Sequence, residues 1–366
     1  MAIEPLVWRR DWAVAPGEIL LEALQDRDMS QSELARRMGR PIKTINEIVN
    51  GKAAITPDTA IQLERTLGIA ATFWNNLEAA YREHLARERA QKELEANAAW
   101  ADAFPIKDLV RHKLIERGPT KGATLAALLR YFGVNSPKTW ESHWLAPAVS
   151  LRASPAFASS PHAVAAWLRW GEIMAADIQT ASFDAKRLRE VLPEIRGLTR
   201  REPFTQIITR VQELCATAGV ALVLTPELGK TRLSGAARWL SPDKAVIQLS
   251  LRHKSDDQFW FSFFHEAGHL LGRKREDFID AADAEDGDRN NAEEDVDRFA
   301  RDCLIPPRDY ADFVAAGTFT SEAVRDFAKQ HGIAPGIVVG RLHRDKLLDR
   351  SHLNDLKKPI RWARTS

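Results

Sequence analysis

The segment FWFSFFHEAGHLLG, from Phe259 to Gly272, encloses two histidines and a glutamate in an almost wholly apolar run. A globular chain buries such a run, and the polar side chains are buried with it. Residues i and i+4 of a helix share one face, so His265 and His269 can both point at one metal ion. Two partly satisfied histidines on a core helix are the alternative. In either case the rest of the fold must cover this helix.

Glu266 follows the first histidine and is rotated off the face that the two histidines share. It can therefore touch a water on the metal without binding the metal itself. Zinc takes such sites with three protein ligands and a water, whose pKa falls to about 7. Glu266 would accept the proton of that water and pass it to a leaving amine. The pattern predicts a Zn2+ centre with Glu266 as its catalytic base.

A second helix, AEEDVDRFARDCLI, offers the third ligand. Glu293 and Asp297 are four residues apart and face the same way. Glu293 is the predicted metal ligand, and Asp297 would orient a ligand histidine from behind. Glu294 is the competing candidate. The alternative for all these acids is a solvated helix start, where carboxylates favour the helix dipole.

Three segments before the central helix read as strands: VALVL, SGAARWL and KAVIQLSL. The last two are joined at Ser241-Pro242-Asp243, which has the chemistry of a hairpin turn. A strand pair beside the metal would let an extended peptide bind by adding a strand at its edge. An acidic loop is expected from Glu276 to about Arg289.

The segment MSQSELARRMGRPIKTINEIVNGKAAIT has the pattern of a helix-turn-helix. Ser30 and Glu33 form a predicted capping box, and Gly39 makes the turn. The apolar residues expected to pack are Leu34, Ala35, Met38, Ile42, Ile45, Ile48 and Val49. The predicted DNA contacts are Gln31 and Arg36 to phosphates, and Lys43, Thr44 and Asn46 to base edges in the major groove. A helical bundle without a DNA function is the alternative, since the first 95 residues carry no basic excess.

Composition narrows the class of protein. The chain is 45% hydrophobic and 28% charged, with a net charge of +2, which is typical of a soluble globular protein. The two cysteines, Cys215 and Cys303, have no partners at metal spacing and favour a reducing cytosol over a disulfide scaffold. No signal peptide or membrane span is expected. These features predict a cytoplasmic protein of α+β class, mainly α.

The two metal-site helices resemble the ImmA/IrrE family of zinc metallopeptidases. That family follows H-E-x-x-H with an E-x-x-A-N-x-F-A-x-x-L-L-x-P helix, which Phe299, Ala300, Leu304, Ile305 and Pro306 fit. Val296 and Asp297 stand where the family has Ala and Asn, although Asp keeps a polar group. The resemblance covers roughly residues 201–350 and implies a zincin-like domain that cleaves proteins.

The N-terminal region resembles the HigA-type antitoxins, a lambda-repressor-like family. The resemblance covers about 80 residues and rests on Pro16, Gly17, Glu18, Ile19, Thr56, Pro57, Phe73, Trp74, Asn76 and Leu77. Arg40 departs from it, because an apolar residue usually stands there. The resemblance implies a homodimer on a palindromic operator.

The expected organisation has four parts: a HigA-like domain at residues 1–97, a helical middle region at 98–200, an ImmA/IrrE-like domain at 201–350 and a tail at 351–366. The first function hypothesis is a DNA-binding regulator whose zinc endopeptidase, active only conditionally, cleaves a repressor or antitoxin to control a stress or toxin–antitoxin operon. The second is a non-proteolytic repressor or antitoxin that neutralises a toxin by contact, with the peptidase fold as scaffold or sensor. The intact Glu266 favours the first. The expected partners are double-stranded operator DNA and a repressor, antitoxin or toxin protein, with no membrane.

Overall fold

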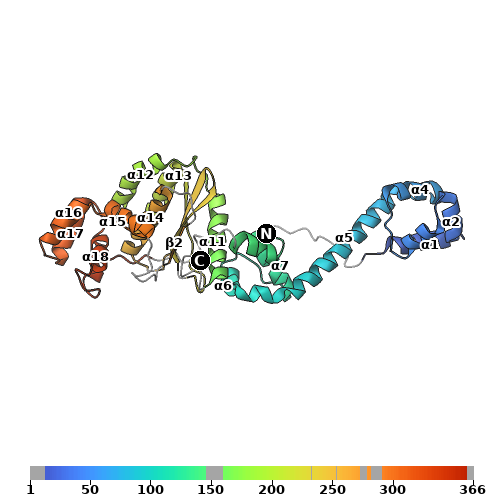
Figure 1. Cartoon of the computed structure of the whole chain (residues 1–366), viewed down its shortest axis with the longest axis horizontal. Coiled ribbons are helices and arrows are strands. Elements are labelled where there is room, and N and C mark those ends of the chain that lie inside the picture. The colour runs from blue at the N-terminus through green and yellow to red at the C-terminus, as the bar shows by residue number, and fades with distance from the viewer. Residues whose placement is uncertain are drawn as a thin grey trace. The chain divides into compact units, whose positions relative to one another are not determined.

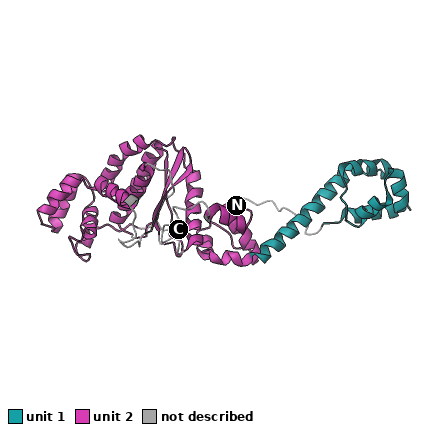
Figure 2. Cartoon of the chain, in the orientation of Figure 1, with its two compact units in different colours: residues 1–97 teal, residues 98–366 magenta. Residues whose placement is uncertain are grey.

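The computed structural model describes residues 13–145, 160–231, 233–252, 254–272, 278–281 and 291–360. The chain divides into two compact units, residues 1–97 and residues 98–366 (Figure 2). Among the helices that the structure describes, none combines the length and the apolar character that crossing a bilayer requires. Each unit has a hydrophobic core of its own and is described by itself below.

The first unit is a bundle of five helices. They are α1 (Pro16–Gln25), α2 (Gln31–Met38), α3 (Ile42–Val49), α4 (Pro57–Leu67) and α5 (Ala71–Ala96). Ser30 caps α2 by accepting a hydrogen bond from the Glu33 N–H, and Gly39 ends it in the left-handed region at φ 63°. Leu34, Ile45 and other wholly buried apolar residues from all five helices form the core. The helix–turn–helix geometry of α2 and α3 is thus held by packing.

The second unit begins with helices. They are η1 (Ala98–Ala103), α6 (Ile106–Arg111), α7 (Lys121–Phe132), α8 (Pro137–Trp140), η2 (Glu141–Leu145), α11 (Pro161–Ala176), α12 (Ala185–Leu198) and α13 (Phe204–Thr217). Rings from several of these segments pack together, among them Trp100, Phe104, Phe132 and Trp140. α11 is tied to the sheet through Glu172, which pairs with Arg238 of β2 at 2.8 Å.

A four-stranded sheet follows, in the order β1-β3-β2-β4. Its strands are β1 (Val220–Leu224), β2 (Leu233–Ser241), β3 (Lys244–Leu249) and β4 (Phe278–Ala281). β1 and β3 are parallel, whereas β2 runs antiparallel to both β3 and β4. The β2–β3 hairpin closes where Ser241 pairs with Lys244, which confirms the predicted turn.

Helices cover both faces of this sheet, with α11 on one side and α12, α13 and α14 (Asp256–Leu271) on the other (Figure 1). Alternate side chains of β1 pack against the helices on the two faces of the sheet. Val220 and Leu222 join the large core that includes α14, whereas Ala221 and Val223 pack with Ala175 of α11. Side chains of successive strand residues point to opposite faces, so a strand covered on both sides is apolar throughout. α11 and α12 lie in the stretch that the sequence predicts as a separate helical region.

The remaining helices are α15 (Asn291–Leu304), α16 (Pro307–Ala315), α17 (Ser321–His331), α18 (Pro335–Arg344) and the short η3 (Asn354–Leu356). α18 approaches the start of α14 closely, because a Cβ at Gly336 would lie 2.5 Å from Asp256 Oδ1. The C-terminal segment adds a bridge between Ser255 and Pro359, and the Lys358 N–H donates to Asp256 Oδ1 at 2.9 Å. The N-terminal end of α14 is therefore held from two sides.

The expectation of a mainly helical chain with a small sheet and an N-terminal helix-turn-helix is confirmed. Two local predictions are wrong. β4 lies inside the expected acidic loop and pairs with β2, so β2 is not free to add a peptide strand along that side. Ile42, expected to pack, is 48% exposed. Residues 282–289 of the expected loop lie outside the described residues. The zincin-like character of the second unit and the boundary at residue 200 stay predictions.

Candidate functional site

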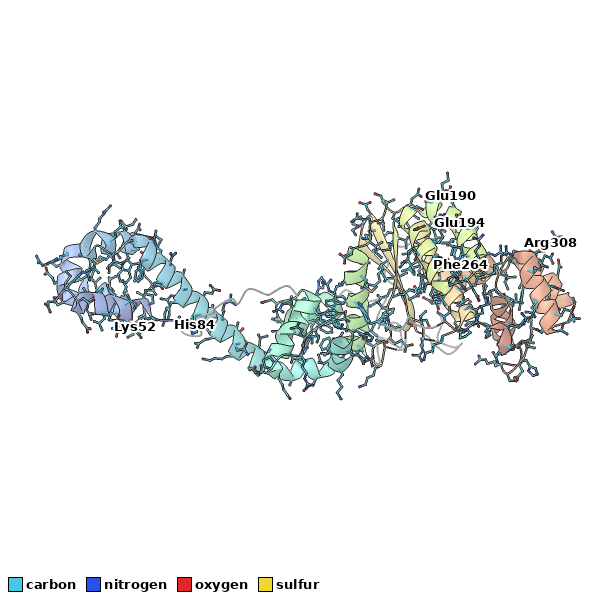
Figure 3. The ribbon with its side chains drawn as sticks, turned by 180° about the vertical axis from the view of Figure 1, so that it is seen from behind. Lys52, His84, Glu190, Glu194, Phe264 and Arg308 are labelled. Carbon is cyan, nitrogen blue, oxygen red and sulfur yellow. The ribbon has the colours of Figure 1, made fainter. Side chains whose placement is uncertain are left out.

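The helix α14 carries the three polar residues of the apolar segment into the protein interior. His265, Glu266 and His269 are 3%, 0% and 4% exposed. Around them, Phe263, Ala267 and Phe264, the last labelled in Figure 3, belong to the large core of the second unit. The flanking apolar residues therefore fix the helix in place, and the polar side chains have little freedom to move.

The helix α15 brings Glu293 to the two histidines. The two Nε2 atoms of His265 and His269 are 3.0 Å apart. Glu293 Oε2 lies 3.4 Å from His265 Nε2 and 3.7 Å from His269 Nε2. Together these are the one group of three within the described residues that could hold a metal ion. Glu294, the competing candidate, is exposed on the same helix.

These distances fit a zinc ion. With Zn–N and Zn–O bonds of about 2.0–2.2 Å, tetrahedral coordination places neighbouring ligand atoms roughly 3.3–3.6 Å apart. The three separations observed, 3.0 to 3.7 Å, bracket that value. Two imidazoles and one carboxylate are also a donor set that catalytic zinc sites use, with the fourth position left for water. The residues present thus match the ion in both geometry and chemistry.

Behind the cluster, Asp297 and Arg344 form a chain of polar contacts that ends on His265. Asp297 Oδ1 lies 3.0 Å from His265 Nδ1. Its other oxygen, Oδ2, accepts a hydrogen bond from Arg344 Nη2 at 2.9 Å. A carboxylate on the rear nitrogen of a histidine fixes the ring orientation and directs Nε2 forward. Arg344 is not part of a recognisable sequence motif, and only the fold shows that it contacts Asp297.

Burial controls the charge of the cluster. Burial, followed by the charge of the neighbouring His265, lowers the pKa of His269 to about 3. Burial also acts to raise the pKa of Glu293, but the hydrogen bond with His265 and the nearby His269 outweigh it, so that pKa lies below its usual value. A neutral imidazole beside an ionised carboxylate is the state in which both can bind a metal.

Two glycines allow the close approach that the site needs. A Cβ at Gly235 of β2 would lie 2.5 Å from Glu266 Oε1. A Cβ at Gly268 would lie 2.9 Å from side-chain atoms of Val296 and Phe299 on α15. Any larger residue at these positions would push the sheet or α15 away from α14. Nothing in the sequence distinguishes Gly235 and Gly268 from the other glycines, so the need for a small residue at these two positions could not be predicted.

The second candidate site is the outer surface of α3 in the first unit. Lys43 and Asn46 are exposed and Thr44 is partly exposed, whereas Ile45 and Ile48 are buried. Lys43 Nζ lies 3.8 Å from Glu47 Oε1, one turn further along the helix. The three side chains predicted to reach base edges are thus all accessible from solvent. Ile42, the first residue of α3, lies on the same surface.

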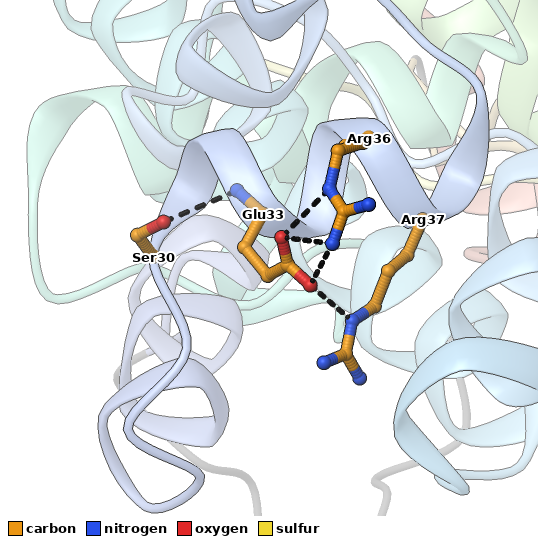
Figure 4. Close-up of polar contacts among 4 residues, drawn as sticks. All are labelled: Ser30, Glu33, Arg36 and Arg37. Atoms are coloured by element: carbon orange, nitrogen blue, oxygen red, sulfur yellow. Dashed lines mark hydrogen bonds and ion pairs between the residues drawn. The ribbon is translucent and has the colours of Figure 1, made fainter.

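The preceding helix α2 supplies the predicted phosphate contacts. Gln31 is partly exposed at its first position, and Arg36 is exposed in its last turn. Arg36 and Arg37 both bind the carboxylate of Glu33, with Arg37 Nε donating to Oε1 at 2.7 Å and Arg36 Nε to Oε2 at 2.9 Å (Figure 4). These contacts hold the pKa of Glu33 below its usual value. The predicted capping box is therefore half formed, because the Glu33 side chain turns to the arginines.

Comparison with known proteins identifies the first unit. The helix-turn-helix family matches residues 20–74. An uncharacterized HTH-type transcriptional regulator of Escherichia coli, YddM, is 38% identical over 66 residues, which are 18% of this chain and 70% of that protein. Virulence-associated protein I of Dichelobacter nodosus is 39% identical over 80 residues, covering 22% of this chain and 74% of that protein.

Solved structures of similar sequence include an addiction module antidote protein of a HigA family from Coxiella burnetii. It is 38% identical, covers 23% of this chain and 91% of its own, and has a TM-score of 0.22. The Pseudomonas aeruginosa antitoxin HigA, solved with the higBA promoter, is 36% identical, covers 23% of this chain and 94% of its own, and has a TM-score of 0.22.

Proposed function

Because this chain belongs, through its N-terminal unit, to the helix-turn-helix family of transcriptional regulators, we propose that it is an operator-binding regulator that carries a zinc-dependent endopeptidase in its second unit. The first unit is a DNA-binding helix-turn-helix domain with an antitoxin-like sequence. The peptidase activity, the zinc and the ImmA/IrrE-like character of the second unit are parts of the proposal. So is the homodimer on a palindromic operator.

One observation carries the enzymatic part: three metal-binding side chains from two helices converge within zinc distance, directly beside a wholly buried glutamate. A purely structural core has no need of this arrangement. Two buried imidazoles and a partly buried carboxylate, placed within bonding distance of one point, are a set of donors that a metal ion suits.

The residues divide the chemistry among them. His265, His269 and Glu293 would hold the ion, and Asp297 and Arg344 would fix the orientation of His265. Zinc bound there would supply a Lewis acid and a water with a pKa near 7. The Glu266 carboxylate, next to a ligand but off the ligand face, would take up a proton and return it to the nitrogen of the leaving amine. The apolar residues around α14 exclude bulk water from this exchange.

The substrate that fits is an extended or locally unfolded protein segment, since low-stability segments open most readily. Tethering to a DNA-binding unit raises the effective concentration of targets bound near the operator. We therefore propose conditional cleavage of a repressor-like or antitoxin-like partner. The segment from Glu88 to Ala103 is a second candidate. It is helical, in α5 and η1, and would have to unfold locally before cleavage.

The test compares the wild type with Glu266→Gln and with Glu190→Gln as a control. Glu190, labelled in Figure 3, is an exposed acid of α12. It pairs with Arg187 on the same helix. Each protein is co-expressed with the product of the neighbouring gene, and fragments are identified by mass spectrometry. New fragments should appear with the wild type and Glu190→Gln and vanish with Glu266→Gln, while zinc content and DNA binding stay unchanged.

Equal fragments from Glu266→Gln and the wild type would exclude the peptidase. The second candidate function would then stand: a repressor or antitoxin that neutralises a toxin by contact. It rests on the antitoxin-like sequence of the first unit and needs no catalytic base.

A further inference from the structure

Ile42 stands out on the surface of the DNA-binding unit. It is 48% exposed, the largest exposed fraction among the large apolar side chains that the structure describes. Single exposed apolar residues are common on protein surfaces and by themselves need no explanation. The position of Ile42 is what carries information, because it is the first residue of α3.

In a helix-turn-helix, the N-terminal residues of the second helix contact base edges in the major groove. Ile42 and Asn46 are four residues apart on α3 and therefore share one face of the helix. Ile45 and Ile48 are buried in the core of the unit, whereas Ile42 and Asn46 are exposed. The surface that Ile42 and Asn46 share is consequently the one turned away from the protein and available to DNA.

The neighbouring residues leave this surface open. Arg40 Nε donates to Gln62 Oε1 at 2.6 Å, so its guanidinium is directed toward α4. Lys43 extends along the helix toward Glu47, and its side chain is 83% exposed. Ile42 is thus an uncovered branched aliphatic group beside polar side chains that can donate to bases.

We propose that Ile42 is a specificity-determining residue that reads the C5-methyl group of a thymine in the operator. Thymine presents this methyl in the major groove, and apolar side chains recognise it by contact. Asn46 would bind an adenine through N6 and N7. Four helical residues span about 6 Å and one base-pair step about 3.4 Å, so the two contacts fall within roughly two base pairs. The proposal rests on α3 as the recognition helix and adds what that helix reads.

The experiment starts from a duplex selected from a random DNA library with the full-length protein. Each thymine of the selected site is then replaced singly by deoxyuridine, which lacks only the C5-methyl. At one thymine per half-site the wild type should lose about fourfold in affinity, the equivalent of one methyl group at about 0.8 kcal/mol. Ile42→Ala should bind the unmodified site less tightly and show no further loss at that thymine.

Ile42→Val keeps two methyl groups and should retain the dependence on the thymine methyl. Ile61→Ala is the matched control, because Ile61 is a 42% exposed isoleucine on α4. It should behave as the wild type. A scan with no sensitive thymine, or an Ile42→Ala variant that keeps the full methyl dependence, would overturn the proposal.

The same DNA and variants distinguish a failure of this proposal from a failure of its premise, that α3 is the recognition helix. If Asn46→Ala and Lys43→Ala lose the selected sequence while Ile42→Ala keeps its methyl dependence, α3 reads the DNA without Ile42. If the library yields no enriched sequence at all, recognition by α3 fails together with the role of Ile42.

Discussion

The two candidate sites of this chain differ most in their burial. On α3 the residues predicted to read DNA lie on the outside of a small bundle, with only their aliphatic neighbours inside. On α14 the residues predicted to bind metal and move protons lie inside the second unit, 0 to 4% exposed. An exposed site can adapt to its partner on binding, whereas a buried site must be formed before the partner arrives.

This difference determines what a substitution does. At the exposed site, a change removes one contact with DNA and leaves the fold intact. At the buried site, each side chain is held by others, as His265 is by Asp297 and Asp297 is by Arg344. We therefore expect large, coupled effects in the second unit and small, nearly additive effects in the first.

Apart from replacing a ligand histidine, the largest effect should come from Glu293→Ala, which removes one of the three proposed ligands. Loss of a group behind a ligand already costs about 10–100-fold in metal affinity, so loss of a ligand should exceed 100-fold. Competition with a chromogenic chelator measures it. Glu294→Ala is the matched control and should bind zinc as the wild type does. If Glu294→Ala lost zinc affinity and Glu293→Ala kept it, Glu294 would be the ligand.

Burial should also produce an unusual pH dependence of stability in the second unit. Burial, followed by the nearby Asp257, raises the pKa of Asp256 to about 6. The folded chain then holds this proton more tightly than the unfolded chain, whose Asp pKa is about 3.9. The contribution of Asp256 to the free energy of unfolding should therefore decrease as pH rises from about 4 to about 6, by up to about 3 kcal/mol at 1.36 kcal/mol per pKa unit.

Thermal unfolding between pH 4 and 7 tests this dependence. Asp256→Asn should remove this contribution and leave those of the other titrating groups, because the amide oxygen can still accept the N–H groups of Asp257 and Lys358 but no longer titrates. Asp349→Asn is the control. Hydrogen bonds from Ser351 lower the pKa of Asp349, so replacing Asp349 should not remove the decrease that Asp256 causes. Wild-type stability that rises over this pH range relative to Asp256→Asn would contradict the burial argument.

A smaller effect is expected from Arg344→Gln, which acts on the metal only through Asp297. Without the guanidinium, Asp297 holds His265 less firmly, and zinc affinity should fall about tenfold. Arg210→Gln, on the surface of the same unit where Arg210 pairs with Glu194, should leave zinc affinity unchanged. Equal zinc affinity in Arg344→Gln and Arg210→Gln would show that the buried site does not depend on this chain of contacts.

The smallest effect should come from Glu33→Gln on the exposed side. Glu33 occupies Arg36 and Arg37, which would otherwise be free to bind phosphates. Releasing them should raise DNA affinity a few-fold and steepen the salt dependence by about one to two charges. Glu83→Gln, which frees Arg87 on α5, controls for the change in net charge. Unchanged salt dependence in Glu33→Gln would place both arginines away from the DNA.

The parts that could be predicted from sequence are those fixed by local chemistry. Apolar spacing and the Ser30 and Gly39 signals place α2 and α3, and the Ser241–Asp243 turn places the hairpin. β4 could not be predicted, because its four residues form a strand only by pairing with β2. Gly235 and Arg344 belong to the candidate metal site through contacts with residues far away in the sequence. Ile42 fits the apolar periodicity of α3. It is the first residue of that helix, however, and side chains tilt toward the helix N-terminus, so Ile42 points beyond the end of α3.

The metal content of the purified full-length protein tests the central claim most directly. Protein from metal-replete cells should carry about one zinc per chain, and His265→Ala and His269→Ala should each lose it while binding operator DNA as the wild type does. Wild-type protein with no transition metal would contradict the account of the second unit. So would zinc that persists when both histidines are replaced.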